Sequence, residues 1–326
     1  MKTTKLRTLV LLALLLSITS LTTGLATAKK KKEAPRGTPI LWQRPTDISS
    51  RDLYLGPGGA AMKPDLRRIT FIKEEKGGYS KKYRVRDGSG REWVAKIGKE
   101  AQSETSAIRL LWGVGYVTEV NYLVPRVTIP GKGTFNNVRF EARPDNWDRV
   151  TEWKWKRNPF TGTPEFQGLK IMMALINNWD LKDSNNQIVH IRGANGDELR
   201  YIISDLGATF GHASTTPLLW RFTRSRNNPV NYAKSNFLEK VKGDRVVLHF
   251  GGKNRGLMKD IDVEDAQWMA SWLSQLSDRQ LRDAFRAANY RPDEINLLTR
   301  SVRERTNELL SLRASPTIQI GRKRKY

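Results

Sequence analysis

Apolar and polar residues follow two different spacings along the chain, and the change comes near its middle. In the first half they alternate in short runs, as where Tyr83 and Val85 alternate with Arg84 and Arg86. A period of two is typical of strands that bury one face. From Phe166 onward apolar residues recur every three or four positions, which is typical of helices packed on a core. The pattern predicts an α+β fold of two lobes, a small antiparallel sheet with one helix and then a larger, mainly helical lobe.

The first lobe is expected to span residues 69–150. One helix is predicted from Ser103 to Trp112, where Gly113 and Gly115 end it. The expected strands lie at 69–72, 83–86, 93–97, 122–124 and 138–140. Because short strands joined by turns pair with their neighbours, we expect these strands to form one antiparallel sheet with the helix beside it.

The second lobe is expected to span residues 151–313. A stripe of apolar residues from Phe166 to Ile176 predicts a buried helix that leads into a polar segment. Asp262 and Asp265 resemble a capping pair that opens one of three C-terminal helices. The two short strands expected between these helices lie at 188–191 and 201–203.

The N-terminal segment has the order of a secretory signal peptide. Three basic residues precede an uncharged apolar run from Leu9 to Ile18, and the small-residue site Ala26-Thr27-Ala28 follows. Residues 1–28 are therefore expected to be a cleaved signal peptide, and the mature protein to be periplasmic or extracellular without a membrane span. Residues 29–68 are expected to form a linker or N-terminal arm, and 314–326 a basic tail.

The composition narrows the classes of function. The formal net charge of +24 attracts polyanions such as acidic polymers, anionic lipids or nucleic acid. No zinc finger, helix-turn-helix or aromatic–basic ribonucleoprotein pattern is present, so specific nucleic-acid binding is not expected. The absence of cysteine excludes thiol nucleophiles and zinc–thiolate sites. The three histidines are dispersed, which argues against a histidine metal site or a Ser-His-Asp triad.

The first candidate for phosphate chemistry is Lys96, on one of the expected strands. A lysine on a strand can project its ammonium group toward phosphates, and Gly77 and Gly78 in the preceding hairpin let backbone N–H groups approach the same anion. Such a lysine needs a carboxylate to orient it, and Glu104 on the expected helix is the candidate. Glu100, just before that helix, is the alternative.

The segment 180–185 is the most informative part of the chain. Asp180 precedes Lys182 by two positions and Asn185 by five. This spacing resembles the D-x-K-x-x-N of kinase catalytic loops, where the Asp takes the proton of an attacking hydroxyl, the Lys steadies the transferring phosphate and the Asn binds a metal ion. Two other interpretations stay open: a polar loop that caps helix ends, and a hydrolase pair of Asp180 with Asp183. In the D-x-K-x-x-N interpretation Asp183 points away from the site.

Asp205 is the last candidate. It leaves the apolar strand expected at 201–203 and enters a turn with Leu206 and Gly207. An aspartate in this place can hold a divalent ion against phosphates. A D-x-G turn is common by itself. The order in which it occurs gives it weight: strand lysine, helix glutamate, D-x-K-x-x-N, then a strand followed by Asp-Leu-Gly.

Residues 69 to about 310 resemble, in this order of motifs, the protein-kinase-like superfamily in its atypical branches. The resemblance implies a phosphate-binding pair, a catalytic base with its companion, and two metal ligands: Lys96 with Glu104, Asp180 with Lys182, and Asn185 with Asp205. It also implies Mg²⁺ or Mn²⁺ with ATP or another nucleotide. Segments 177–182 and 205–211 further resemble a group of exported bacterial proteins, a resemblance that names no activity.

The chain departs from eukaryotic protein kinases in three ways. Asn178-Trp179 replaces the His-Arg of H-R-D, there is no A-P-E, and the glycine loop is incomplete. The basic stretch 211–251 replaces the usual peptide-binding segments. The sequence therefore predicts transfer of phosphate, or another nucleotide-derived group, to an unidentified envelope or extracellular acceptor. An acidic polymer and a protein are the two kinds of acceptor considered. The alternative is an inactive kinase-like module that docks an acidic envelope partner.

Overall fold

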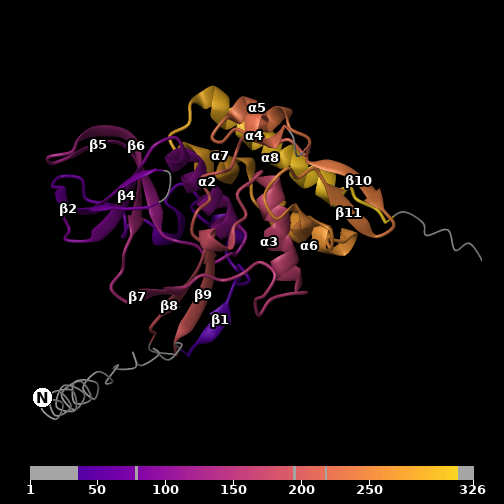
Figure 1. Cartoon of the computed structure of the whole chain (residues 1–326), viewed down its shortest axis with the longest axis horizontal. Helices are drawn as coiled ribbons and strands as arrows, with labels where there is room; N and C mark the ends of the chain where they lie inside the picture. Colours follow the sequence, from indigo (N-terminus) through magenta and orange to yellow (C-terminus); the bar gives the residue numbers. More distant parts are fainter. Residues whose placement is uncertain (1–35, 78–79, 194–195, 217–218, 315–326) are drawn as a thin grey trace, which may run out of the picture. The chain divides into compact units, whose positions relative to one another are not determined.

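The computed structural model (Figure 1) describes residues 36–77, 80–193, 196–216 and 219–314. The predicted signal peptide and its cleavage site lie outside the described residues, as do Gly78 and residues 315–326 of the predicted basic tail. Within the described ranges, no helix has the length and apolar character needed to cross a bilayer.

The first lobe is a five-stranded antiparallel sheet with a helix beside it. In sheet order, the strands are β2 (Thr70–Glu75), β3 (Lys81–Arg86), β4 (Glu92–Ile97), β6 (Gly133–Ala142) and β5 (Asn121–Ile129). Helix α2 (Glu100–Gly113) connects β4 to β5 (Figure 1). The turn between β3 and β4 forms because Asp87 accepts hydrogen bonds from the backbone N–H groups of Ser89 and Arg91, each at 3.0 Å.

The two faces of this sheet differ in chemistry. On one face, alternate residues of the strands form an apolar cluster that includes Tyr83, Val85, Trp93 and Phe140, none more than 1% exposed. The residues between them point to the opposite face, which is mostly charged and carries Lys96. The apolar core of this lobe therefore lies on the side of the sheet away from Lys96.

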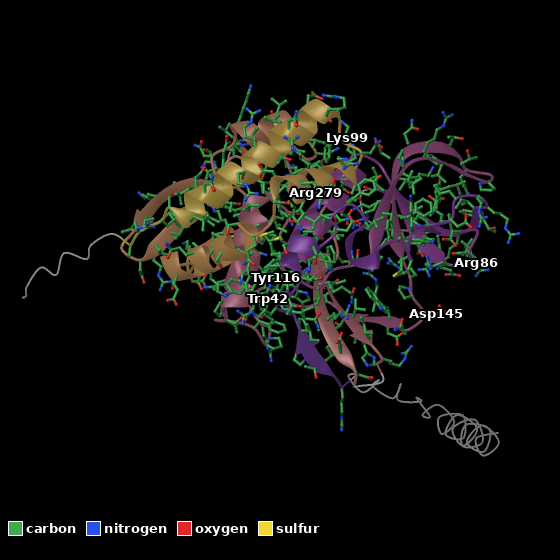
Figure 2. All side chains as sticks on the ribbon, turned by 180° about the vertical axis from the view of Figure 1, so that it is seen from behind. Trp42, Arg86, Lys99, Tyr116, Asp145 and Arg279 are labelled. Carbon is green, nitrogen blue, oxygen red and sulfur yellow. The ribbon has the colours of Figure 1, made fainter. Side chains whose placement is uncertain are left out.

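A second, mixed sheet joins distant parts of the chain. Its strands, in order, are β1 (Thr38–Ile40), β9 (Glu198–Ile203), β8 (Asn186–Ile191) and β7 (Trp147–Thr151). Strand β1 runs parallel to β9, and Trp42 just after it bridges to Tyr116 (Figure 2). Leu41, Ile48 and Leu53 are buried in the main core. Part of the N-terminal arm is thus built into the fold.

The second lobe is mainly helical, with one further hairpin. The helices are α3 (Pro164–Leu175), α4 (Trp220–Thr223), α5 (Pro229–Lys234), α6 (Val263–Leu273), α7 (Asp278–Arg286) and α8 (Pro292–Leu310). The hairpin pairs β10 (Leu238–Lys242) with β11 (Arg245–Leu248). Short 3₁₀ helices lie at Ile48–Ser50, Gly56–Gly58, Asp183–Asn185 and Arg255–Met258. The predicted capping pair is present: Asp262 accepts from the N–H of Asp265 at 2.8 Å, and Asp265 accepts from the N–H of Asp262 at 3.3 Å.

Helices α3, α6, α7 and α8 surround the main core, to which α2 also contributes Ile108 and Leu111. Helix α2 therefore belongs to the first lobe by its connections and to the core of the second by its packing. The predicted α+β fold, with a small antiparallel sheet and one helix before a larger, mainly helical part, is confirmed.

Candidate active site

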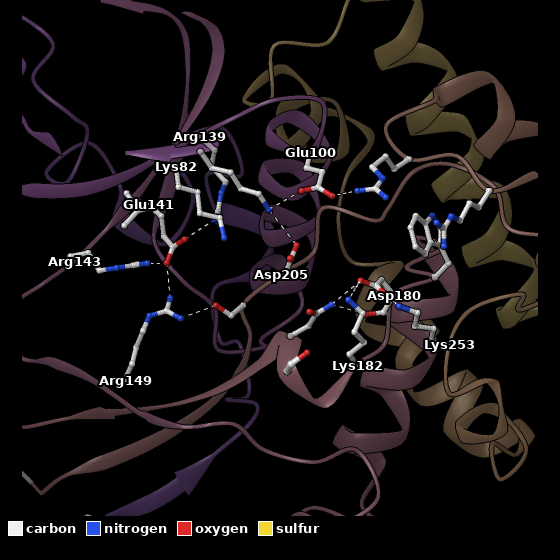
Figure 3. Close-up of a pocket in the computed structure, with 18 residues that line it drawn as sticks. Lys82, Glu100, Arg139, Glu141, Arg143, Arg149, Asp180, Lys182, Asp205 and Lys253 are labelled. Atoms are coloured by element: carbon white, nitrogen blue, oxygen red, sulfur yellow. Dashed lines mark hydrogen bonds and ion pairs between the residues drawn. The ribbon is translucent and has the colours of Figure 1, made fainter. Parts of the chain in front are cut away.

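The charged face of the first sheet borders a cavity of about 540 Å³ (Figure 3). The predicted site residues Lys96, Asp180, Lys182, Asn185 and Asp205 all line it. Of its eighteen described lining residues, nine are lysine or arginine and four are aspartate or glutamate, so the cavity attracts anions.

Lys96 contacts three carboxylates. Its Nζ lies 2.8 Å from Glu104 Oε2, 3.2 Å from Glu100 Oε2 and 3.3 Å from Asp205 Oδ1. Burial favours the neutral amine, but the attraction of these carboxylates prevails and raises the pKa of Lys96 above its usual value. The predicted ion pair with Glu104 is present, and Lys96 is a permanent cation beside the cavity.

Helix α2 begins at Glu100, three residues before its predicted start, so that both candidate carboxylates lie on the helix. Glu100 and Glu104 are four residues apart and therefore share one helix face. Burial raises the pKa of Glu104 to about 7 against the opposing attraction of Arg139 and Lys96. Glu100 also contacts the guanidinium of Arg226. The structure thus brings both sequence candidates to Lys96.

Asp180 is held by two lysines. Its Oδ2 lies 2.8 Å from Lys182 Nζ, and its Oδ1 lies 2.7 Å from Lys253 Nζ. Burial works to raise the pKa of Asp180, but hydrogen bonds from Lys182 and Lys253 prevail and lower it. The amide of Asn185 donates to the backbone oxygen of Asp180 at 2.7 Å and closes the loop. Asp180 is therefore an ionised carboxylate at neutral pH.

The hairpin of β8 and β9 brings Asn185 and Asp205 together. The backbone oxygen of Asn185 accepts hydrogen bonds from the N–H of Ser204 at 2.8 Å and from the N–H of Asp205 at 3.3 Å. Burial works to raise the pKa of Asp205, but the attraction of Lys96 and a hydrogen bond from the N–H of Gly207 prevail and lower it. The Asp205 side chain is still 43% exposed, so its carboxylate can reach a ligand in the cavity.

Helix α2 and the turn after Asp205 are in close contact. A Cβ atom added to Gly207 would lie 2.7 Å from the Cβ atom of Glu100. Any side chain at position 207 would therefore require the helix to shift. Ser103 Oγ donates to the backbone oxygen of Gly207 at 3.0 Å, and Thr209 Oγ1 donates to that of Ser103 at 3.3 Å. The position of Asp205 is thereby tied to the helix that carries the partners of Lys96.

Two other sequence candidates lie elsewhere. Gly77 has a positive φ of 102° between β2 and β3 but is not a cavity-lining residue, and Gly78 lies outside the described part of the chain. Asp183 accepts a hydrogen bond from the backbone N–H of Trp155 at 3.1 Å and does not line the cavity. Asp183 is thus hydrogen-bonded to the backbone of Trp155 and stands outside the cavity lining, which fits the D-x-K-x-x-N interpretation.

Asn185 and Asp205 offer the oxygen ligands that a small hard cation prefers. Because Asn185 Nδ2 donates to the backbone of Asp180, its amide oxygen remains as an acceptor, and Asn185 and Asp205 line the same cavity. Mg²⁺ is commonly held by one or two protein carboxylates together with phosphate oxygens and water. Among the described residues, no three His, Asp or Glu side chains gather as a metal site. These two residues therefore fit an ion that completes its coordination with phosphate oxygens.

An ion-pair network beside Lys96 was not among the features expected from the sequence. Arg139 and Arg149 each lie 2.6 Å from Glu141 (Figure 3). Arg139 also lies 3.2 Å from Glu104, and Arg149 also contacts Glu119. The alternation of charges at positions 139 and 141 of β6 and at position 143 just after it is the signal that could have indicated it.

The basic stretch after Asp205 also reaches the cavity. The guanidinium groups of Arg224 and Arg226 lie 5.1 Å and 4.9 Å from the centre of the Trp179 ring, within cation–π distance. Lys253, just beyond this stretch, contacts Asp180. No local pattern marks these residues as partners of Trp179 and Asp180, since they lie more than forty positions away from both in the sequence.

Two kinases are among the solved structures to which this chain is similar. The Helicobacter pylori proinflammatory kinase CtkA is 12% identical, with a TM-score of 0.45 over 76% of this chain and 94% of that chain. The Rio2 kinase–ADP/Mg²⁺–phosphoaspartate complex from Chaetomium thermophilum is 11% identical, with a TM-score of 0.29 over 73% of this chain and 72% of that one. No family model and no curated protein matches the chain.

At these TM-scores neither likeness assigns the fold by itself. The kinase-like architecture is inferred from the strand lysine and helix glutamate of the first lobe, followed by the D-x-K-x-x-N loop, a hairpin and the Asp-Leu-Gly turn. This order of motifs resembles that of the protein-kinase-like superfamily, and Lys96, Asp180, Asn185 and Asp205 from it line one cavity.

Proposed function

We propose that the protein is a phosphotransferase that uses a nucleotide with Mg²⁺ or Mn²⁺ and acts on an acceptor outside the cytoplasm. The observation that carries the proposal is that Lys96, Asp180, Asn185 and Asp205 line one anion-attracting cavity. Each supplies a group that phosphoryl transfer needs: a cation for phosphate oxygens, a base, and two oxygen donors for a metal ion. The metal ion would neutralise charge on the transferring phosphate.

Asp180 is the base in this proposal. It accepts the proton of the acceptor hydroxyl while the oxygen of that hydroxyl bonds to the terminal phosphorus and the bond to the leaving phosphate breaks. The lowered pKa of Asp180 keeps the carboxylate ionised at neutral pH, which is the form that can accept a proton. Lys182, 2.8 Å from Asp180, lies where it can hold the transferring phosphate.

Thermal unfolding of the purified protein with and without nucleotide tests this proposal. A ligand that binds only the folded state raises the melting temperature, and saturation at about 100 times Kd adds about 2.7 kcal/mol. We expect ATP to raise the melting temperature by several degrees only when Mg²⁺ or Mn²⁺ is present. Transfer of labelled phosphate to any acceptor would then establish turnover. No shift with millimolar nucleotide and either metal would contradict the proposal.

An inactive binding module is the second candidate, and one observation favours it. Both oxygens of the Asp180 carboxylate are engaged by ammonium groups, which reduces the basicity that proton transfer needs. In this case the cation-rich cavity would dock an acidic envelope partner. Metal-dependent binding without any phosphate release or transfer would select this candidate.

Export completes the proposal. Its support is the order of basic residues, apolar run and small-residue site in residues 1–28, with cleavage expected after Ala28. N-terminal sequencing of protein recovered from the periplasm or medium tests it. Full-length chain found only in the cytoplasm would contradict it.

A further inference from the structure

The wall that the first sheet presents to the cavity is charged. Strand β4 turns Val94 and Lys96 toward it, and from β6 and the residue after it come Arg139, Glu141 and Arg143, at every second position. Strand register sets Val94 opposite Glu141, and Lys96 opposite Arg139. The large apolar residues of these strands all point to the other face of the sheet, so they cannot line a ligand site here.

The wall continues with polar groups from the second sheet. Arg149 from β7 lies 2.6 Å from Glu141, and its guanidinium donates to Ser204 Oγ at 2.8 Å. Ser204 Oγ in turn donates to Glu119 at 2.7 Å. Of the eighteen described residues that line the cavity, only Val94 and Trp179 are apolar. The Trp179 ring already carries the guanidinium groups of Arg224 and Arg226.

Such a lining is unsuited to a buried nucleobase. Sites for small organic molecules are lined mainly by apolar and aromatic side chains, and a base inserted here would have to displace paired charges from the wall. A phosphate chain has the opposite requirement, since it gains charge-assisted hydrogen bonds from lysine and arginine. The excess of nine cationic over four anionic lining residues meets that requirement.

We propose that the cavity recognises its donor by the phosphate chain and the metal ion, and that the base contributes little. Inorganic tripolyphosphate then binds as well as ATP does. This inference rests on the proposed phosphotransferase function. With tripolyphosphate as donor, the bond from the terminal phosphorus to its bridging oxygen breaks and the acceptor oxygen bonds to that phosphorus. Pyrophosphate leaves with the electron pair, and the proton of the acceptor hydroxyl passes to Asp180.

Titration calorimetry of the purified protein with ATP, GTP, inorganic tripolyphosphate and adenosine, each with Mg²⁺, tests the inference. We expect the dissociation constants of ATP, GTP and tripolyphosphate to agree within about threefold, and adenosine not to bind. Binding of ATP at least tenfold tighter than both GTP and tripolyphosphate would overturn the inference while leaving the proposed function intact. Failure of all three phosphate ligands to bind would overturn both.

An arginine variant tests the same point from the side of the protein. Arg143→Gln removes one cation of the charged wall, and Glu141 keeps Arg139 and Arg149 as partners. We expect Arg143→Gln to weaken the binding of ATP and the binding of tripolyphosphate by the same factor, roughly tenfold, because each ligand loses one charge-assisted contact. The matched control is Arg126→Gln, because Arg126 is exposed on β5 of the same sheet and does not line the cavity. Loss of ATP affinity alone in Arg143→Gln would show recognition of the base and overturn the inference.

Discussion

Replacing Lys96 with methionine should destabilise the protein in a pH-dependent way. The side chain of Lys96 is only 3% exposed and contacts Glu100, Glu104 and Asp205. Methionine keeps most of the volume but leaves three acidic groups clustered without their shared cation. Removing one member of a buried ion pair typically costs about 3–5 kcal/mol.

We expect Lys96→Met to lower the free energy of unfolding by about 3 kcal/mol at neutral pH, the lower end of this range. Glu104 keeps Arg139 at 3.2 Å, and Glu100 keeps its contact with Arg226. Asp205 is left mainly with the backbone N–H of Gly207. The free energy lost therefore comes chiefly from Asp205 and from repulsion among the three acidic groups.

The pH dependence follows from the pKa values. Burial opposes ionisation of Glu100 and Asp205, but Lys96 prevails and lowers both pKa values. A carboxylate with a lowered pKa stabilises the folded state above its unfolded pKa, and this contribution is lost as pH falls through the folded pKa. Lys96→Met removes that contribution, so the gap between wild type and variant should be widest at neutral pH. It should narrow only below about pH 4, as the pH falls through the lowered pKa values of these two carboxylates and they take up protons.

Urea unfolding of wild type and variant at about pH 7.5 and about pH 3.5 measures both effects. Lys99→Met is the matched control because Lys99 is exposed immediately before α2 (Figure 2), and it should change the free energy of unfolding by less than about 0.5 kcal/mol. Equal losses for Lys96→Met at the two pH values, or a loss no larger than that of the control, would refute the reasoning.

Two further predictions concern the loop and the turn. Lys253→Met should raise the pKa of Asp180, because Asp180 then loses one of its two lysine partners. The acid limb of the pH–activity profile should therefore move to higher pH. If the acid limb is unchanged, Asp180 is not the base. Gly207→Ala should force α2 away from the turn, with a stability loss of about 1–3 kcal/mol and weaker nucleotide binding, since the new Cβ would lie 2.7 Å from that of Glu100. In the control Gly256→Ala, the added Cβ has no atom within 4 Å, so nucleotide binding should be unchanged. Equal losses of stability and binding in the two variants would contradict the close contact between Gly207 and α2.

Local patterns were sufficient to predict the first lobe. Alternating residues indicated the strands, and the strand lysine and helix glutamate indicated the ion pair between Lys96 and Glu104. The sequence predicts too late a start for α2 because no capping side chain precedes the helix: Lys99, at the N-cap, makes no side-chain hydrogen bond to it. Glu100 is therefore expected outside the helix, whereas it lies in the first turn.

Long-range contacts could not be predicted. Strand β1 pairs with β9, about 160 residues later, and the residues that follow it enter the core, although a segment rich in proline and glycine indicates only an irregular arm. Lys253 reaches Asp180 from a similarly unmarked segment. In both cases the partner is set by tertiary packing, which a periodicity of two or 3.6 does not encode.

The most direct test of the proposed site is a calorimetric titration of nucleotide, in the presence of Mg²⁺, into wild type, Asp205→Asn and Asp183→Asn. It measures what Asp205 contributes to binding. Asp205→Asn keeps the size of the side chain and removes the charge, and Lys96 keeps Glu100 and Glu104 as partners, so the protein should stay folded. Loss of a charged ligand should cost on the order of 2 kcal/mol or more, a weakening of roughly 30-fold or greater. Asp183→Asn should bind as wild type does, because its oxygen can still accept from the N–H of Trp155. Intact binding in Asp205→Asn together with lost binding in Asp183→Asn would contradict the kinase-like assignment of this site.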